Sequence, residues 1–183
     1  MSRLLLKNRE AQDGINGHLK QNYTQHGRYD EDANQEGILW LVSSGDLPEV
    51  VRKLRDDSSL AMDRLADLSA YDNIDGVDGV GRFVFFIHLY SSKFHSRMRI
   101  KCLVADGEEV PTLTGVWPMA NWLERECFDM FGIRFRGHPD MRRILMDERF
   151  EGYPLRKEYA LEARQQFSDS LPIRMVTESE VSK

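Results

Sequence analysis

The chain has 183 residues, of which 25 are Lys or Arg and 30 are Asp or Glu, giving a formal net charge of -5 at pH 7. That length suits one ordinary domain, and the 41% hydrophobic and 30% charged shares exclude a disordered chain. The net negative charge argues against broad electrostatic capture of nucleic acid. The longest apolar run, Phe83 to Tyr90, has strand length and falls short of the roughly 20 residues of a membrane helix.

The first 37 residues are polar and rich in Asn, Gln, Asp, Gly and His, so we expect a loosely ordered N-terminal extension with at most a short helix. They lack the apolar core and cleavage site of a signal peptide. Residues 38–44 form an apolar run bounded by Gly37 and Gly45, which predicts a strand. A helix is expected to follow from Asp46, with Pro48 in its first turn.

The middle of the chain predicts three strands, at 62–71, 82–90 and 97–104. A Gly-rich loop, 73–81, separates the first two, and a hairpin joins the last two. In the third strand Met98, Ile100, Cys102 and Val104 alternate with Arg97, Arg99 and Lys101, so the basic face is expected to meet water or an acidic partner.

A helix is predicted from Met119 to Phe131, with Gly132 as its stop. The chain beyond is irregular, with one short helix expected near Asp140 to Met146. The order of elements predicts an α+β fold, in which a small, mostly antiparallel sheet carries helices on one side. We therefore divide the chain into a polar N-terminal extension (1–37), an α+β domain (38–137) and an extended C-terminal segment (138–183).

The stretch Asn121 to Leu145 is dense in charge, which raises the question of catalysis. Glu124 and Glu126 lie two positions apart and point to nearly opposite sides of a helix, so they cannot jointly flank one bond. Arg125 and Asp129, four apart, can pair. We place Glu126 on or near an apolar stripe, where it needs an arginine, Arg142 or Arg143. The stripe is formed by Met119, Trp122, Leu123, Cys127, Met130 and Phe131.

Other chemistries find little support. The five histidines lack partners at ligand spacing, and His138 before Pro139 suits a cap or packing role. Cys102 and Cys127 form neither a disulfide framework nor a metal site and fit a reducing compartment. There is no Gly-x-Ser-x-Gly elbow or phosphate loop. Arginines interleaved with carboxylates suit a protein surface of mixed charge better than nucleic acid.

Two blocks carry a resemblance to a known family. They are WPMANWLERECFDMFGIRFRGHPDMRRIL and FEGYPLRKEY, the latter from Phe150 to Tyr159. They resemble the 30 kDa subunit of respiratory complex I, which in bacteria is the C subunit of NADH-quinone oxidoreductase. The matching positions in the first block are Glu124, Arg125, Glu126, Asp129, Met130, Phe131, His138, Arg143, Ile144 and Leu145. The second block adds Arg156 and Lys157, and the Gly-His-Pro-Asp-x-Arg-Arg run adds Pro139 and Arg142.

The resemblance implies a non-catalytic core subunit of the peripheral arm, with a structural and assembly role and no activity in isolation. It implies no cofactor, metal or catalytic residue on this chain, because FMN and the iron–sulfur clusters belong to partner subunits. The implied partners are the 49 kDa-type D subunit and the iron–sulfur B and I subunits, and neighbouring subunits bind quinone. The implied location is the cytoplasmic side of the bacterial inner membrane, peripheral and held there through the complex.

Alternatives remain open at this point. The equivalent subunit of a complex I-related membrane-bound hydrogenase, or of another donor-linked quinone reductase, would carry related motifs. An independent enzyme would need a pocket around Glu126 and Asp129, and a nucleic-acid-binding protein would need salt-dependent retention on an oligonucleotide.

Overall fold

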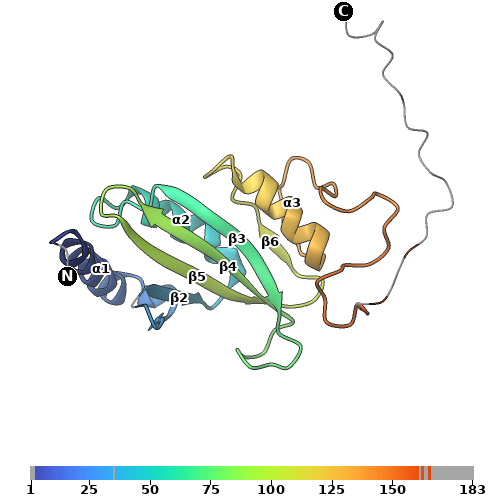
Figure 1. The fold of residues 1–183 in the computed structure, drawn as a ribbon, viewed down its shortest axis with the longest axis horizontal. Helices are drawn as coiled ribbons and strands as arrows, with labels where there is room; N and C mark the ends of the chain where they lie inside the picture. The colour runs from blue at the N-terminus through green and yellow to red at the C-terminus, as the bar shows by residue number, and fades with distance from the viewer. Residues whose placement is uncertain (1–2, 35, 161, 163–164, 166–183) are drawn as a thin grey trace, which may run out of the picture.

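The computed structural model describes residues 3–34, 36–160, 162 and 165, and it describes side chains from residue 9 onward. It is an α+β fold built on a mixed sheet (Figure 1). The helices are α1 (Arg3–Asn22), α2 (Leu47–Asp56) and α3 (Ala120–Phe131), with short 3-10 turns η1 (Thr24–His26) and η2 (Ser44–Asp46). The strands are β1 (Gly27–Glu31), β2 (Gly37–Leu41), β3 (Arg64–Asp72), β4 (Phe83–Ser91), β5 (Ser96–Val104), β6 (Glu109–Pro111) and β7 (Arg134–Arg136).

The five-stranded sheet has the order β1-β2-β5-β4-β3. Only β2 and β5 pair in parallel within it, so the expected mostly antiparallel sheet is confirmed. The expected hairpin between β4 and β5 is present, with Ser91 opposite Ser96. A separate parallel pair, β6 and β7, brackets α3 in the sequence. These two three-residue strands are too short to leave a periodic signal in the sequence.

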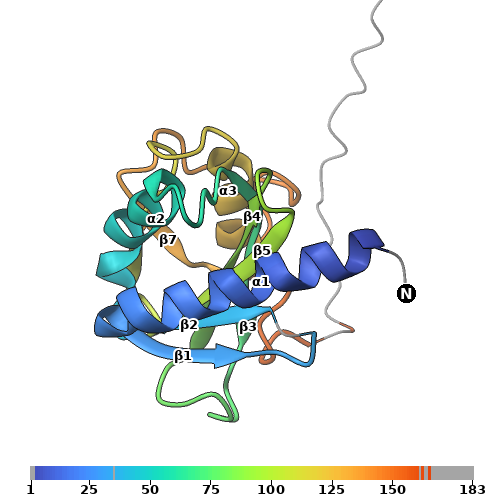
Figure 2. The same cartoon turned by 90° about the vertical axis from the view of Figure 1, so that its left-hand side faces the viewer.

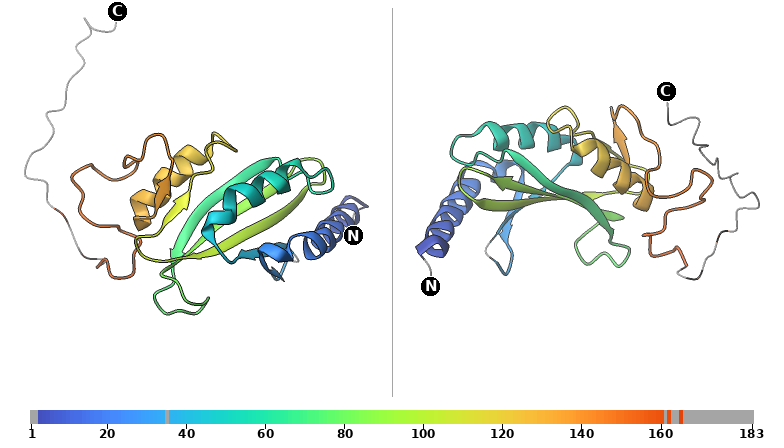
Figure 3. Two further views of the ribbon diagram at one scale, coloured as in Figure 1. Left: turned by 180° about the vertical axis from the view of Figure 1, so that it is seen from behind. Right: turned by 45° about the horizontal axis from the view of Figure 1, so that its top comes forward.

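Helix α2 covers one face of the sheet (Figure 3), and the hydrophobic core lies between them. On β5 every second residue from Met98 to Val104 is buried, as the alternation predicts. Helix α2 packs its apolar face, Leu47, Val50, Val51 and Leu54, into the same cluster, and α3 adds Ala120, Cys127 and Phe131. Each fully buried aliphatic side chain stabilises the fold by about 1.5–3 kcal/mol relative to exposure.

The N-terminal region corrects our expectation of loose order. Helix α1 has 20 residues, and Figure 2 shows it lying close to β2. Ile15, Leu19 and Tyr23 recur every four residues and are buried, a narrow stripe that the polar composition hides. The Gln12 side-chain amide donates to the backbone O of Arg97 and accepts from its N–H, at 2.9 and 3.1 Å. Strand β1 then joins the sheet beside β2.

The opposite face of the sheet meets its own acidic partners. Arg99 lies 3.5 Å from Asp32 and 3.8 Å from Glu36, both in the turn between β1 and β2. Lys101 lies over the ring of Trp40. The acidic partners of Arg99 on this basic face therefore belong to the same chain. Among the described residues, no helix is both long and apolar enough to cross a bilayer.

Candidate functional site: a helix clamped by its C-terminal strap

Helix α3 turns two carboxylates inward and one outward. Glu124 and Asp129 are fully buried, whereas Glu126 is exposed. The predicted position of Glu126 on the apolar stripe is therefore wrong, and it forms no ion pair within the described part of the chain. The buried face follows the spacing 120, 124, 127 and 131, and Glu126 stands two positions from Glu124, on the other side. Met119 and Trp122, also assigned to the stripe, are exposed.

Asp129 is the anchor of the segment that follows the helix. Its Oδ2 accepts hydrogen bonds from three successive backbone N–H groups, those of Ile144, Leu145 and Met146, at 3.0, 2.8 and 2.9 Å. Its Oδ1 accepts from Arg143 Nη1 at 2.6 Å. Burial alone would raise the pKa of this carboxyl, but the backbone donors and the guanidinium outweigh it and hold the pKa below its usual range.

This arrangement replaces two expectations. The short helix near Asp140 to Met146 is absent, because the amides of 144–146 turn to the Asp129 carboxylate instead of to preceding carbonyls. The pairing of Arg125 with Asp129 is also wrong. Arg125 donates to the backbone carbonyls of Arg142 and Arg143, at 3.0 and 3.1 Å, and lies over the ring of Trp122.

Residues 138–160, the C-terminal strap, contact α3 from its first turn to its last. Arg143 links the two halves of the strap, since its Nη2 donates to the carbonyl of Gly152 at 2.9 Å. Its guanidinium lies over the rings of Phe150 and Tyr153. Arg142, the other arginine proposed for Glu126, is exposed and makes a two-pronged pair with Asp140.

Gly132 lets the strap approach closely. Its φ of 79° ends α3 in the left-handed conformation that favours glycine, as expected for the helix stop. A Cβ at this position would lie 2.5 Å from the ring of Tyr153. Leu155 N–H then donates to the carbonyl of Met130 at 3.1 Å. The glycine therefore serves the helix end and the packing of the strap at once.

Glu124 and His138 fix the other end of the helix. Glu124 accepts hydrogen bonds from Thr112 Oγ1 and from the N–H of Leu113, both at 2.6 Å. Its burial raises the pKa to about 7, against the lowering effect of those two donors. The His138 ring is buried, with its Nε2 4.0 Å from Glu124 Oε2. Asp140 N–H donates to His138 Nδ1, so the ring proton is on Nε2, which donates to the carbonyl of Asn121. His138 thus has a packing role, whereas the short helix that it was expected to cap is absent.

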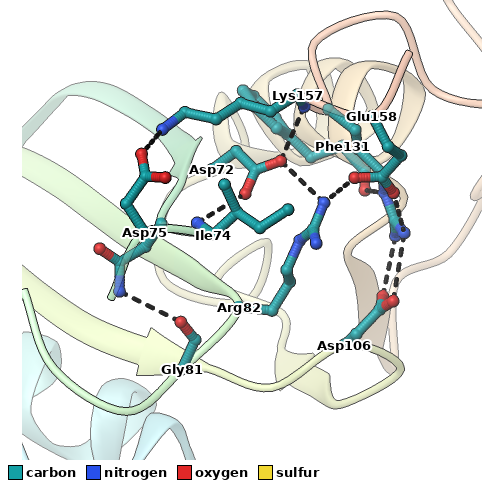
Figure 4. A network of polar contacts seen from close by, with 11 residues as sticks. Asp72, Ile74, Asp75, Gly81, Arg82, Asp106, Phe131, Lys157 and Glu158 are labelled. Atoms are coloured by element: carbon teal, nitrogen blue, oxygen red, sulfur yellow. Dashed lines mark hydrogen bonds and ion pairs between the residues drawn. The ribbon is translucent and has the colours of Figure 1, made fainter. Parts of the chain in front are cut away.

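The last part of the strap is held by a polar network (Figure 4). Arg156 donates from Nε to the carbonyl of Phe131 at 2.7 Å and pairs with Asp106 at 3.0 Å. Asp72, buried at the end of β3, accepts from the N–H of Lys157 at 2.8 Å and from Arg82 at 2.9 Å. Burial would raise the pKa of Asp72, but these donors outweigh it and lower the pKa. Arg82 also pairs with Glu158.

Several charged residues of the two motif blocks contact other groups of this chain. Arg125, Asp129, Arg143, Arg156 and Lys157 all bind groups of this same chain. A cleft of about 880 Å³ lies elsewhere, lined by β3, β4, β5 and Trp117 to Met119, and the α3 carboxylates are not among its lining residues. Within the described residues, no group of three or more His, Cys, Asp or Glu side chains is arranged to hold a metal ion.

What faces outward is a mixed apolar and charged surface. We call it the outward patch, and it comprises Met119, Trp122, Glu126, Pro139, Arg142 and Leu145. Trp122 and Arg125 are in contact, and Arg125 bonds to the 142–143 backbone, so the helix and strap parts of the patch adjoin. Trp, Met and Arg are the residue types enriched at protein interfaces.

The sequence did not reveal the partners that the strap engages. Asp72, Arg82, Asp106 and Thr112 lie outside the motif blocks, and folding brings them to Arg156, Lys157 and Glu124. The predicted strand ended at residue 71, and the structure extends β3 by one residue, so that Asp72 lies at its end with its side chain buried.

Comparison with solved structures identifies the class of fold. The chain is similar to a chain in the structure of the membrane-bound sulfane sulfur reductase, an archaeal respiratory membrane complex, with a TM-score of 0.68. The alignment covers 88% of this chain and 96% of that chain, at 17% sequence identity, so the likeness is one of fold. The fold is therefore one found in a protein of a multi-subunit respiratory complex.

Sequence comparison identifies the family. The model of the respiratory-chain NADH dehydrogenase 30 kDa subunit matches residues 40–165, and the chain belongs to this family. The second C-type subunit of NADH-quinone oxidoreductase from Rhizobium meliloti (strain 1021) is 49% identical over 122 residues, which is 67% of this chain and 65% of that protein. The C-type subunit of the same enzyme from Cupriavidus pinatubonensis (strain JMP 134 / LMG 1197) is 44% identical over 127 residues, 67% and 64% of the two chains. The aligned part thus spans just under two thirds of these relatives.

Proposed function

We propose that the chain is a non-catalytic core subunit of the peripheral arm of proton-translocating NADH-quinone oxidoreductase, with a structural and assembly role. The observation that carries this proposal is the family match over 40–165, which includes β3, β4, β5, α3 and the strap. The motif residues Asp129, Arg156 and Lys157 bind other groups of this same chain, and this supports a structural role. The buried and paired family charges thus build the fold, whereas Glu126 and Arg142 belong to the outward patch, which is left for contact.

In this proposal FMN and the iron–sulfur clusters reside on partner subunits, and neighbouring subunits bind quinone. The partners are the 49 kDa-type D subunit and the iron–sulfur B and I subunits. The chain is peripheral, on the cytoplasmic side of the bacterial inner membrane, and the isolated chain is inactive. The outward patch, with its exposed Trp122 beside Arg125, is the contact surface that we assign to this assembly.

A second candidate is the equivalent subunit of a related complex with another electron donor or acceptor, such as a membrane-bound hydrogenase. The fold shared with a chain of an archaeal sulfane sulfur reductase complex favours keeping it. Both candidates give this chain the same architectural role, and they differ in the reaction of the whole assembly.

The test is affinity purification of the tagged chain from membranes in mild detergent, with mass spectrometry and an NADH–quinone activity assay on the eluate. Co-purification of flavin and iron–sulfur subunits with quinone reductase activity is the expected result. A nickel–iron hydrogenase subunit in their place would change the reaction and leave the role. A chain that elutes alone would contradict the proposal.

A matched pair of variants tests the contact surface. Trp122→Ser removes an exposed aromatic from the outward patch, and we expect about tenfold less co-purified partner, since buried tryptophans dominate many interfaces. Val42→Ser removes an exposed side chain beyond the end of β2 and should retain the partners. Equal retention by both variants would remove the outward patch from the proposal without touching the family assignment.

A further inference from the structure

An open groove crosses the face of the sheet that α2 leaves uncovered. It is the cleft of about 880 Å³, and its floor is formed by the first residues of β3, the last of β4 and the first of β5. Asn34 and Glu36, from the turn between β1 and β2, line it on one side, and residues 117–119 line it on the other. Figure 1 looks onto this face, and no helix lies in front of the strands there.

Three cross-strand neighbours lie on the floor of the groove. Tyr90 of β4 stands opposite Arg64 of β3 and opposite Arg97 of β5 in the strand register. Directly paired residues project from the same face of a sheet, so the Tyr90 ring has an arginine on each side. We call these three residues the Arg-Tyr-Arg row. Neighbouring strands are about 4.8 Å apart, so the backbones of the two arginines are separated by about 10 Å.

The two arginines of the row are exposed, and neither has a carboxylate partner within the part of the chain that the structure describes. The Arg97 guanidinium lies over the Tyr90 ring, 6.0 Å from its centre. Glu36 and Asp63 are the acids that line the groove, and both are engaged elsewhere. Glu36 lies 3.8 Å from Arg99, and Asp63 accepts a hydrogen bond from Ser92 N–H at 2.8 Å.

The positive charge of the groove is therefore concentrated on the row. Arg99, on the same face, is already held, because it pairs with Asp32 and Glu36 and donates from Nε to His88 Nε2 at 2.9 Å. Burial and the Arg99 charge lower the pKa of His88, so this ring stays neutral and does not add to the charge. What the groove offers to an anion is the pair of guanidinium groups on either side of Tyr90.

We propose that the groove binds an acidic, extended segment of a neighbouring subunit of the same respiratory complex, with two carboxylates of that segment on Arg64 and Arg97. This inference rests on the proposed function. Its basis is charge complementarity, since guanidinium groups bind carboxylates through two parallel N–H bonds. An extended chain advances about 3.3 Å per residue, so carboxylates about three residues apart match the spacing of the two arginines.

The position of the groove also suits a neighbouring subunit. Met119 lines the groove and belongs to the outward patch that we assign to assembly, so a protein covering that patch reaches the groove as well. Tyr and Arg, the residue types of the row, are those that contribute most to binding at protein interfaces.

Other anions fit the row less well. A single small anion would need both guanidinium groups to converge, whereas the Tyr90 ring stands between them. A nucleic-acid strand carries a phosphate at every nucleotide and would also meet Glu36 and Asp63. A peptide segment places its carboxylates only where the arginines lie.

The first test compares two identical substitutions in the tagged full-length chain purified from membranes in mild detergent. Arg97→Glu reverses the charge on one side of the row, and we expect at least about tenfold less partner subunit per tagged chain. Arg52→Glu is the matched control, because Arg52 is exposed on α2, on the other side of the sheet, and should keep wild-type levels of partner. Both substitutions replace exposed side chains, so thermal melts of the two variants should match the wild type and separate lost contact from lost folding.

The second test detects the carboxylate itself and does not require loss of assembly. Arg64→Lys and Arg97→Lys keep the positive charge, and a carbodiimide couples a lysine ammonium to a carboxylate in contact with it. We expect each variant to give a new crosslink, mapped by mass spectrometry, to an Asp or Glu of a neighbouring subunit. Neither the wild type nor Arg52→Lys should give these crosslinks.

The outcomes separate the two proposals. Wild-type levels of partner with Arg97→Glu, equal losses in Arg97→Glu and Arg52→Glu, or no new crosslink from positions 64 and 97 would each overturn the groove inference. In all three cases the proposed function stands as long as the wild-type chain brings down the respiratory subunits. If the wild-type chain brings down none of them, the proposed function fails and the groove inference falls with it.

Discussion

Replacing Asp129 by Asn tests the strongest contact between α3 and the C-terminal strap. The substitution keeps the size of the side chain but removes its charge. In the wild type the buried carboxylate accepts three backbone N–H bonds and one bond from Arg143. The amide of Asn carries one acceptor oxygen, so its NH2 group must face donors from the strap.

The structure sets the magnitude of this effect. Removing one partner of a buried ion pair costs about 3–5 kcal/mol, because the remaining charge and donors lose their partner. For a chain of this size that corresponds to a fall in Tm of roughly 10 °C. Arg143 retains the Gly152 carbonyl and its aromatic neighbours, which places the expected loss near the lower end.

The assay is urea unfolding of the full-length chain followed by circular dichroism, with limited proteolysis to report on the strap. Asp140→Asn is the matched control, because Asp140 makes a two-pronged pair with Arg142 at the surface. We expect the control to change the free energy of unfolding little, because exposed ion pairs contribute little to stability. A loss of under about 1 kcal/mol in Asp129→Asn, or an equal loss in both variants, would refute the reasoning.

Three further predictions follow from the same contacts. Gly132→Ala should destabilise the chain by about 1 kcal/mol or more in thermal melts, because a Cβ meets the Tyr153 ring and φ is positive; a neutral effect would contradict this packing. Burial raises the pKa of Glu124 in the folded chain, so wild-type stability should fall as pH rises between about 4.5 and 7. Glu124→Gln should flatten this pH dependence of the free energy of unfolding. An unchanged slope in the variant would contradict this role of Glu124. The pKa of Asp129 is lowered in the folded chain, so wild-type stability should fall below about pH 4 as this carboxylate takes up a proton. Asp129→Asn should weaken that fall in acid titrations of stability. The same loss of stability at acid pH in both proteins would contradict this prediction.

Strong local patterns predicted β2, β3, β4, β5 and α3 well, whereas β1 lay in the expected loose extension. The alternation in β5 and the continuous apolar run of β4 identify inner strands, and Gly132 ends α3 where expected. Helix α1 was missed because, among the residues from 9 onward whose side chains the structure describes, its buried stripe has few apolar members, Ile15 and Leu19, with Tyr23 just beyond the helix. There the tertiary contact with the sheet, rather than local composition, selects the helix.

The site was predicted as a region but not in its geometry. The motif residues do lie together, yet the assignment of the buried acid moved from Glu126 to Glu124 and Asp129. A helical stripe shifted by a single residue changes which carboxylate faces the core. The donors that stabilise Asp129 are backbone N–H groups of 144–146, and backbone donors leave no trace in residue identity.

The measurement that tests the central claim most directly is amide hydrogen exchange of the isolated full-length chain. If the family motif orders the strap from within the chain, the amides of Ile144, Leu145 and Met146 are protected without any partner, and Asp129→Asn releases them. Exchange of these amides at the rate of an unstructured chain in the wild type would contradict the account, and the strap would then owe its order to neighbouring subunits.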